Sequence, residues 1–393
     1  MANSIKSEIS CYLDEMIQIR RDFHRHPELA MEETRTAEIV STRLSDLGLK
    51  VTTGIGKTGV VGLLEGSSPG KTLMLRADMD ALPIKEKNKI DYKSINNGLM
   101  HACGHDGHMA ILLTVAKILT TKKNKFSGRI KFVFQPGEEG AAGARLMVED
   151  GVLTKPEVDA VFGLHLNTSF DTNIVALGAG PMMACMDSFT IKVIGKGGHA
   201  AMPEQGKDAI FMSAQVISAL QSLISKEVSP LTPLIVHIGE VHGGRAFNIV
   251  ADEVDLHGTV RTHDEILRKS LPKRIDRIVN GITAALRGTH ELSYQFVYPP
   301  VVNDSTMTEL VKAVAAQVVG DEHVLEISPN MVSDDIAFFL EQVPGCYFFV
   351  GARNAEKGFN KAHHEALFNF DEDALAIGAE IMVRLALSYL KIN

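Results

Sequence analysis

The order of apolar patterns in the middle of the chain is the feature that most restricts its fold. Between about residues 187 and 298, segments with strand and helix character follow one another as β-α-β-β-α-β. The expected strands are 188–194, 233–241, 253–260 and 291–298, and the expected helices are 208–226 and 264–286. This order is typical of a ferredoxin-like module, a compact two-layer fold that can be inserted into a larger domain.

The chain before and after this module alternates helical patterns with short apolar strands. Helices are expected at 9–23, 34–47, 107–119, 306–319 and 371–390, and strands at 60–64, 72–75, 129–134, 160–166 and 345–350. Pro27 and Gly48 end the first two helices, because proline blocks continuation and glycine favours a helix C-terminus. The alternation predicts an α/β domain with a largely parallel sheet. We therefore expect a discontinuous domain, residues 1–186 and 299–393, interrupted by a module of residues 187–298.

Length and composition agree with two domains and restrict the partners. The chain has 393 residues, of which 45% are hydrophobic and 22% charged, and this length exceeds the usual size of one core. A formal net charge of -8 and the absence of a Lys/Arg run argue against a nucleic-acid surface, so small-molecule partners are expected. No segment is apolar and long enough to span a bilayer and no signal segment is apparent, which predicts a cytoplasmic protein without a membrane partner.

The spacing of the cysteines also favours a cytoplasmic protein. Cys11, Cys103, Cys185 and Cys346 are far apart and form no Cys-x-x-Cys pair, which fits a reducing compartment better than a disulfide framework. Cys103 alone has neighbours that bind metals.

Residues 100–108, Met-His-Ala-Cys-Gly-His-Asp-Gly-His, are dense in metal-binding side chains. These are His101, Cys103, His105 and His108, with Asp106 beside them. Imidazole and thiolate donors suit zinc, manganese, cobalt or nickel, and the intervening glycine lets a short loop turn two donors toward one ion. The alternative is a histidine-rich surface loop with one buried cysteine, since short motifs often mislead.

Four further polar clusters each follow an expected strand. They are Asp78 with Asp80, Glu138 with Glu139, His165, and His363 with His364. In open α/β sheets, sites form at the carboxyl ends of the strands, so these clusters are expected to converge with the Cys103 loop. The set has enough donors for two divalent ions, which about 3.5–4 Å apart could both face one scissile carbonyl.

Individual residues of these clusters have alternative interpretations. Glu138 and Glu139 lie between glycines, where one carboxylate could bind metal and the other act as general base, although adjacent carboxylates are usually a solvated turn. Asp80 could orient a ligand imidazole or merely cap a strand end. His165 alone would more often be a core histidine. The glycine-rich turn around His199 could approach a site or serve only as a connector.

Six motifs together resemble the M20 metallopeptidases. They are residues 20–29, 76–83, 101–108, 135–140, 163–165 and 197–201, and they follow one another over nearly the whole chain. The sequence is most similar to the amidohydrolase branch, with hippurate hydrolases, N-acyl-amino-acid deacylases and plant auxin-conjugate hydrolases. The resemblance implies an α/β, di-metal phosphorylase/hydrolase-like catalytic domain with an inserted ferredoxin-like lid that dimerises.

The resemblance also implies a set of metal ligands. These are Cys103, His105, Glu139, His165 and a late histidine, with Cys103 at the position of a bridging aspartate in other branches. The late segment lacks the proline usual in this branch. Counting back from Phe368 selects His364 as the ligand, with His363 as the alternative. His101, His108 and His363 are not needed to complete the site.

The remaining roles carried over by resemblance concern proton transfer and substrate. Glu138 matches the general base, and His199 matches a lid histidine that reaches the active site of the partner subunit. Asn248 and Arg261 match lid positions near the substrate. Ala251 replaces a usual proline and Glu204 a usual histidine, so these positions depart from the family pattern.

The implied activity is hydrolysis of the amide bond of an N-acyl amino acid, with two divalent ions of manganese, zinc, cobalt or nickel per subunit. The expected partners are an N-acyl amino acid or short peptide and a second copy of the chain, bound through the lid, with a tetramer as a further form. Two alternatives stay open: a dipeptidase or aminopeptidase with the same chemistry, and a catalytically idle metal-binding scaffold.

Overall fold

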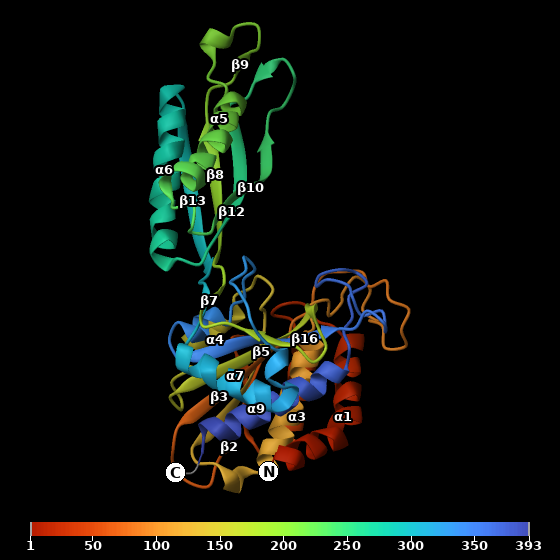
Figure 1. The fold of residues 1–393 in the computed structure, drawn as a ribbon. Helices are drawn as coiled ribbons and strands as arrows, with labels where there is room; N and C mark the ends of the chain where they lie inside the picture. Colours follow the sequence, from red (N-terminus) through yellow and green to blue (C-terminus); the bar gives the residue numbers. More distant parts are fainter. Residues whose placement is uncertain (1, 392–393) are drawn as a thin grey trace. The chain divides into compact units, whose positions relative to one another are not determined.

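The structure is a computed structural model that describes residues 2–391. It divides into two compact units (Figure 1). The main unit comprises residues 2–182, 302–328 and 335–391 of the described chain, and the inserted unit comprises residues 183–301 and 329–334. The segment 329–334 groups with the inserted unit although residues 302–328, which precede it, belong to the main unit, because long-range contacts rather than local pattern define the unit.

An eight-stranded sheet forms the centre of the main unit, in the order β1-β2-β4-β3-β5-β16-β6-β15. Its strands are β1 (Lys50–Ile55), β2 (Gly59–Glu65), β3 (Thr72–Asp78), β4 (Arg129–Gln135), β5 (Ala160–Asp171), β6 (Val175–Leu177), β15 (Val324–Glu326) and β16 (Gly345–Arg353). The four central strands β4, β3, β5 and β16 are parallel, as expected. The sheet is nevertheless mixed, because β1, β2 and β4 pair antiparallel at one side and β6 pairs antiparallel with β16.

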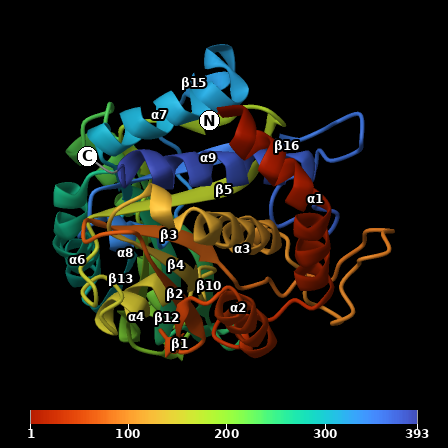
Figure 2. The same ribbon diagram turned by 90° about the horizontal axis from the view of Figure 1, so that it is seen from below.

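Helices cover this sheet. They are α1 (Ala2–Arg25), α2 (Thr34–Asp46), α3 (His105–Thr121), α4 (Gly143–Glu149), α7 (Ser305–Val319), α8 (Ala337–Leu340) and α9 (Asp373–Tyr389), with 3-10 turns at Lys123–Lys125 and Asp321–His323. Helix α3 packs on β3 and contacts both α1 and α9, which also contact each other (Figure 2). It is therefore buried on almost every side, which explains why its sequence is apolar without a clear polar face.

The inserted unit contains β8 (Met186–Ile194), α5 (Ala209–Ser222), β10 (Leu234–Gly243), β12 (Glu253–Thr262), α6 (Glu265–Ala285) and β13 (Thr289–Tyr298). Its sheet has the order β10-β12-β8-β13, and every neighbouring pair is antiparallel. Helices α5 and α6 pack against each other and against the sheet. This is the predicted ferredoxin-like β-α-β-β-α-β fold.

Several short elements were not predicted. They are α4, α8, β1, β6 and β15, together with β7 (Gly180–Met183), β9 (Gly198–His199), β11 (Ile249–Val250), β14 (Val301–Asn303), the 3-10 turn Pro203–Gln205 and a π-helical turn at Leu223–Glu227. Most have too few residues to show a period, and β1 is mainly exposed. Strand β5 also continues past His165 to Asp171, although its pairing with β3 ends at Gly163. Among residues 2–391, no helix has the length and apolar character needed to cross a membrane.

Candidate metal centre

The main unit brings together six of the side chains singled out in the sequence. Potential ligand atoms lie within 4.8 Å of one another in overlapping groups that include Cys103 with His105 and His165, Cys103 with Glu139 and His364, and His105 with Glu138 and Glu139; a further group joins His105 to Asp78 and His108. Because the groups share members, they form one cluster of thiol, imidazole and carboxylate groups. Donors of these types bind zinc and related divalent ions.

Loops at the ends of the central strands place these groups. Gly104, with a φ of 93°, forms the left-handed turn between Cys103 and the first residue of α3, His105. Glu138 and Glu139 follow β4, and His165 lies in β5 beyond its last residue paired with β3. The His364 amide donates to the carbonyl oxygen of Ala102 at 2.8 Å, which holds the late histidine beside the Cys103 loop.

Hydrogen bonds to backbone carbonyls orient the two buried imidazoles. His105 Nδ1 lies 2.8 Å from the Asp80 carbonyl oxygen, and His165 Nδ1 lies 2.7 Å from that of Leu166. A carbonyl oxygen can only accept, so each Nδ1 carries a proton, and in the neutral imidazole each Nε2 then has the free electron pair that a metal ion needs. His165 Nε2 lies 3.4 Å from Cys103 Sγ, and His105 Nε2 is buried without a hydrogen-bond partner. This is how metal-binding histidines are usually held.

Asp80 has a wider structural role than the sequence suggested. Its two carboxylate oxygens accept hydrogen bonds from the backbone amides of Glu138 and Glu139, each at 2.9 Å. Its carbonyl oxygen orients His105, and its carboxylate lies 3.5 Å from the same ring nitrogen. One aspartate therefore fixes both the glutamate loop and an imidazole of the cluster.

The electrostatics of the cluster favour a cation. Burial, together with the carboxylates of Glu139 and Glu138, raises the pKa of the Cys103 thiol well above its usual range. Burial lowers the pKa of His105, but the carboxylates of Asp78, Asp80 and Glu139 outweigh it and raise that pKa to about 10. Negative charge contributes to both shifts, and divalent cations would neutralise it; a metal ion would also stabilise the thiolate of Cys103.

A further buried atom fits a metal. Like His105 Nε2, Glu139 Oε1 is buried and makes no hydrogen bond, although His364 Nε2 lies 3.1 Å from it. Buried polar atoms are almost always hydrogen-bonded, and such exceptions call for an explanation. Coordination to metal would satisfy both atoms, so the residues present fit the ions that the sequence implied.

The other histidines of the motifs have different surroundings. His108 Nδ1 lies 2.6 Å from Asp78 Oδ1, and His108 Nε2 accepts from the Leu166 amide at 2.9 Å, so both ring nitrogens are engaged. His363 Nε2 donates to the Leu166 carbonyl at 2.9 Å, and burial lowers its pKa to about 4. His101 is buried, and burial lowers its pKa to about 3. Of the late pair, His364 is therefore the one that faces Glu139.

A buried ionic network beside the cluster was not recognised in the sequence. Arg20 of α1 is fully buried and contacts Asp106 Oδ2 at 2.8 Å and Glu372 Oε1 at 3.1 Å. His24 Nδ1 lies 2.8 Å from the same oxygen of Asp106. Asp106 directly follows His105, so the network anchors the first turn of α3. The available signal was the i, i+4 spacing of Arg20 and His24, which places both on one helix face.

The three candidate residues of the inserted unit do not form one group. His199 of β9 pairs with Ile249 of β11, and the Ala200 amide donates to the Asn248 carbonyl at 3.1 Å, so His199 and Asn248 are neighbours. Strand β12 starts at Glu253, just after β11, and Arg261 lies near its other end. There the Arg261 Nη1 donates to Ser333 Oγ at 3.4 Å. The strand from Glu253 to Arg261 alone spans about 26 Å at ~3.3 Å per residue.

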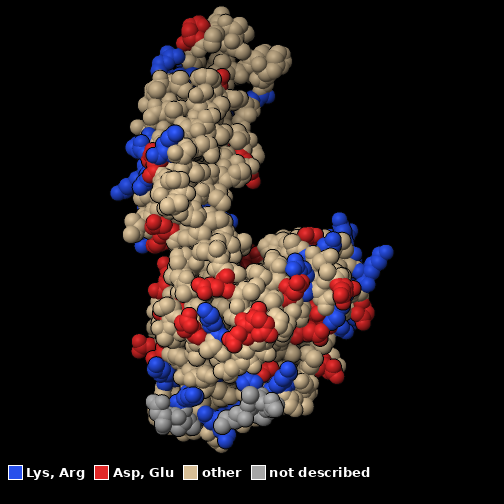
Figure 3. Space-filling model, in the orientation of Figure 1, with Lys and Arg blue, Asp and Glu red and all other residues tan. Residues whose placement is uncertain are grey.

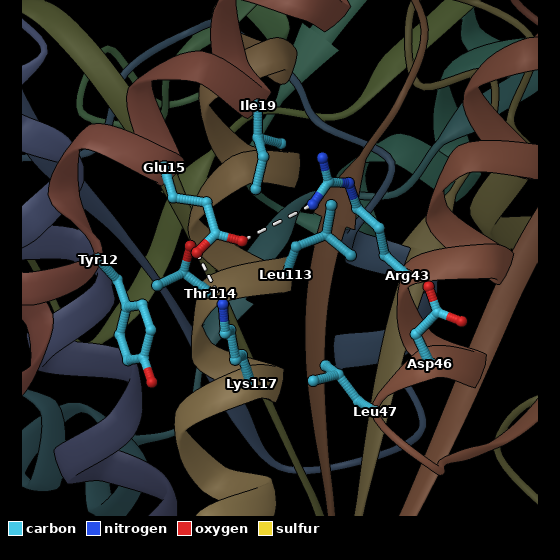
Figure 4. A pocket seen from close by; sticks show the side chains of 9 residues that line it. All are labelled: Tyr12, Glu15, Ile19, Arg43, Asp46, Leu47, Leu113, Thr114 and Lys117. Carbon is cyan, nitrogen blue, oxygen red and sulfur yellow. Dashed lines mark hydrogen bonds and ion pairs between the residues drawn. The ribbon is translucent and has the colours of Figure 1, made fainter.

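The main unit also has a hollow of about 200 Å³, which is separate from the cluster around Cys103 (Figure 4). It is lined by Tyr12, Glu15, Ile19, Arg43, Asp46, Leu47, Leu113, Thr114 and Lys117. Glu15 pairs there with Lys117 at 2.7 Å and lies 3.9 Å from Arg43. Leu113 is eight residues along α3 from His105, or about 12 Å at ~1.5 Å per residue, so the hollow is not part of the metal cluster.

Comparison with known proteins gives a consistent result. The model of peptidase family M20/M25/M40 matches residues 74–388. Thermostable carboxypeptidase 1 of Saccharolobus solfataricus is 39% identical over 393 residues, covering 99% of each chain. The N-acyl-L-amino acid amidohydrolase of Geobacillus stearothermophilus is 44% identical over 303 residues, covering 76% of this chain and 81% of that one. The crystal structure of the Bacillus subtilis YXEP protein, a dinuclear metal binding peptidase from M20 family, superposes with a TM-score of 0.84 at 31% identity, covering 97% of this chain and 99% of that one.

Proposed function

The chain belongs to peptidase family M20/M25/M40 and is a metal-dependent hydrolase of amide bonds, and we propose that it cleaves N-acyl amino acids with two divalent ions per subunit. The resemblance inferred from the motifs is thereby confirmed. The observation that carries the proposal is the position of Glu138, which is 7% exposed and lies in one group with His105 and Glu139. A carboxylate beside metal ligands is the general base that such a hydrolysis needs.

We assign the metal ligands to Cys103, His105, Glu139, His165 and His364. The unshared Nε2 electron pair of His105 and the contact of His364 with Glu139 support this set. When bound, the ions supply positive charge that polarises the scissile carbonyl and makes water more acidic. This borderline donor set suits zinc, manganese, cobalt and nickel alike.

The chain's own residues move the proton. Glu138 accepts a proton from the attacking water as the C–O bond forms, and it returns that proton to the nitrogen as the C–N bond breaks. Asp80 holds the backbone of Glu138 and Glu139 by two hydrogen bonds, so the base is positioned before substrate arrives. The products are a carboxylic acid and a free amino acid.

The names of the relatives suggest what the substrates have in common. One relative is named a carboxypeptidase and another an N-acyl-L-amino acid amidohydrolase. Both kinds of substrate contain an acyl group joined to an amino acid with a free α-carboxylate. We assign Arg261 and Asn248 to substrate binding, since a guanidinium suits a carboxylate. Burial lowers the pKa of Arg261, but arginine stays charged in proteins.

His199 is proposed to act on substrate bound by a partner subunit. Its Nδ1 accepts from the Ala201 amide at 3.0 Å, so its Nε2 carries a proton that could be donated to the developing oxyanion. An N-acyl amino acid is too short to reach both His199 and Arg261 of one inserted unit. Two subunits could supply Arg261 from one chain and His199, with its neighbour Asn248, from the other.

The surface of the inserted unit supports self-association. Around β9, β10, β11 and the start of α5, large apolar side chains are exposed: Met202, Ile210, Phe211, Val241, Phe247 and Ile249. Figure 3 shows few charged side chains on the visible face of this end of the unit. Exposed apolar patches of this kind mark protein interfaces, so we propose a homodimer through this unit, which could pair further into a tetramer.

A substrate panel tests the function. Metal-reconstituted protein is assayed with N-acetyl and N-benzoyl amino acids, their carboxamide derivatives and dipeptides, with Glu138→Gln as the control for contaminating activity. We expect turnover of the N-acyl amino acids and little of the carboxamides. Faster cleavage of dipeptides with a free amine would favour a peptidase, and no turnover by metal-loaded protein would favour the idle scaffold.

A further inference from the structure

Three exposed side chains on the sheet of the inserted unit form a second group with metal-binding character. Glu240 and His242 of β10 and His257 of β12 have ligand atoms within 4.8 Å of one another. His242 Nε2 lies 3.0 Å from Glu240 Oε2, and the rings of His242 and His257 are 5.8 Å apart between centroids. None of the three has a role in the proposed hydrolysis.

A β-bulge brings these residues to the same face. Leu234 and Val236 of β10 point into the core, and in a regular strand Glu240 and His242 would follow them there. The register with β12 shifts between Ile238, which pairs with Gly258, and Glu240, which pairs with His257. One extra residue reverses the alternation, so Glu240 and His242 leave the core face. Their side chains are each 65% exposed.

Neighbouring residues complete the surroundings of the group. His257 Nδ1 lies 3.1 Å from the hydroxyl oxygen of Thr190, which can hold the ring with Nε2 available. Asp255 pairs with His242 in the register and places a further carboxylate on this face.

We propose that Glu240, His242 and His257 bind one borderline divalent ion, such as Zn²⁺ or Ni²⁺, at a site separate from the main-unit cluster. Two imidazoles and one carboxylate form a common zinc-binding set, whereas Ca²⁺ and Mg²⁺ prefer oxygen ligands alone. The ion links β10, an outer strand of its sheet, to β12 beyond the bulge. Its binding therefore secures the part of β10 that follows Gly239.

Zinc stoichiometry of the full-length protein tests this site. Wild type and the variants His242→Ala, His257→Ala and Glu240→Gln are dialysed against the same free Zn²⁺ concentrations, and bound zinc is counted per chain. His290→Ala is the matched control, because His290 pairs with one carboxylate, Asp276, at 2.8 Å on the same unit. We expect each of the three variants to bind one Zn²⁺ fewer than wild type, and His290→Ala to match wild type.

The comparison with wild type makes the result independent of how many ions the main unit holds. The three replaced side chains are exposed, so the variants should keep the wild-type circular dichroism spectrum. Amide hydrogen exchange gives a second measurement: Zn²⁺ should slow exchange in residues 240–243 of wild type but not of His257→Ala. Equal zinc content in wild type and all three variants, or an equal loss in His290→Ala, would overturn the proposal.

Discussion

In the main unit, the candidate catalytic groups are buried and held by hydrogen bonds, whereas those of the inserted unit lie on exposed segments. His105 and Glu138 are 1% and 7% exposed, and both are fixed through Asp80. His199 lies on a two-residue strand with β11 as its only partner among the described strands, and its residue is exposed. The contrast indicates that the metal-binding groups of the main unit are preorganised, whereas few contacts within the chain fix the segment that carries His199.

The largest expected effect tests whether Glu138 acts as the base while Glu139 binds metal. Glu138→Gln should keep metal and fold but lower kcat by more than the roughly 10²–10⁴-fold that proton transfer contributes, because orientation of the attacking water also suffers. Glu139→Gln is the matched variant, and it should lose metal as well as activity. Steady-state kinetics and elemental analysis measure the two effects. A near-normal kcat for Glu138→Gln would show that another group is the base.

The next prediction concerns the buried ionic network under the cluster. Arg20→Met removes the cation that contacts Asp106 and Glu372, and leaving buried charge without its partner typically costs about 3–5 kcal/mol. Urea denaturation measures the loss. Arg129→Met is the control, because Arg129 and Glu65 form an exposed pair worth about 0–1 kcal/mol. Equal effects of both substitutions would mean that the network contributes no more than a surface pair.

The inserted unit should affect turnover without affecting metal. His199→Ala removes a proposed oxyanion donor, and loss of one such donor costs about 10²–10³ in kcat. Metal content should stay at the wild-type level. Mixing His199→Ala subunits with Glu138→Ala subunits should restore activity, because one site of each mixed dimer then has both groups from opposite chains. Verified mixed dimers that stay inactive would place the action of His199 within its own subunit.

The smallest expected effect compares how firmly the two units are folded. Asp264 caps α6 of the inserted unit by accepting from the Ile266 and Leu267 amides at 2.9 Å, and Asp304 caps α7 of the main unit through the Met307 amide at 2.9 Å. Alanine at either position should cost about 1 kcal/mol. Hydrogen exchange should quicken about fivefold in the affected helix only. Equal acceleration in both helices would indicate that the units unfold together.

Much of the fold followed from local pattern. The β-α-β-β-α-β order, the alternating α/β elements around it and the four central parallel strands were all predicted, because long amphipathic or apolar runs reveal their own period. The short strands β6, β9, β11 and β15 could not be predicted. A strand of two or three residues has no period of its own and exists only because a neighbour supplies its hydrogen bonds.

The residue types of the metal cluster were likewise readable from the sequence, because Cys103, His105 and the glutamate pair occur in dense, glycine-flanked motifs. Tertiary structure decided how they are used. His364 rather than His363 faces Glu139, because the Ala102 carbonyl holds its amide and the Leu166 carbonyl takes the His363 ring. Tertiary structure also decided the bulge after Ile238 and the partners of Arg20, which no local pattern predicted. Sequence determines which donors exist, whereas hydrogen bonds between distant segments determine where each one points.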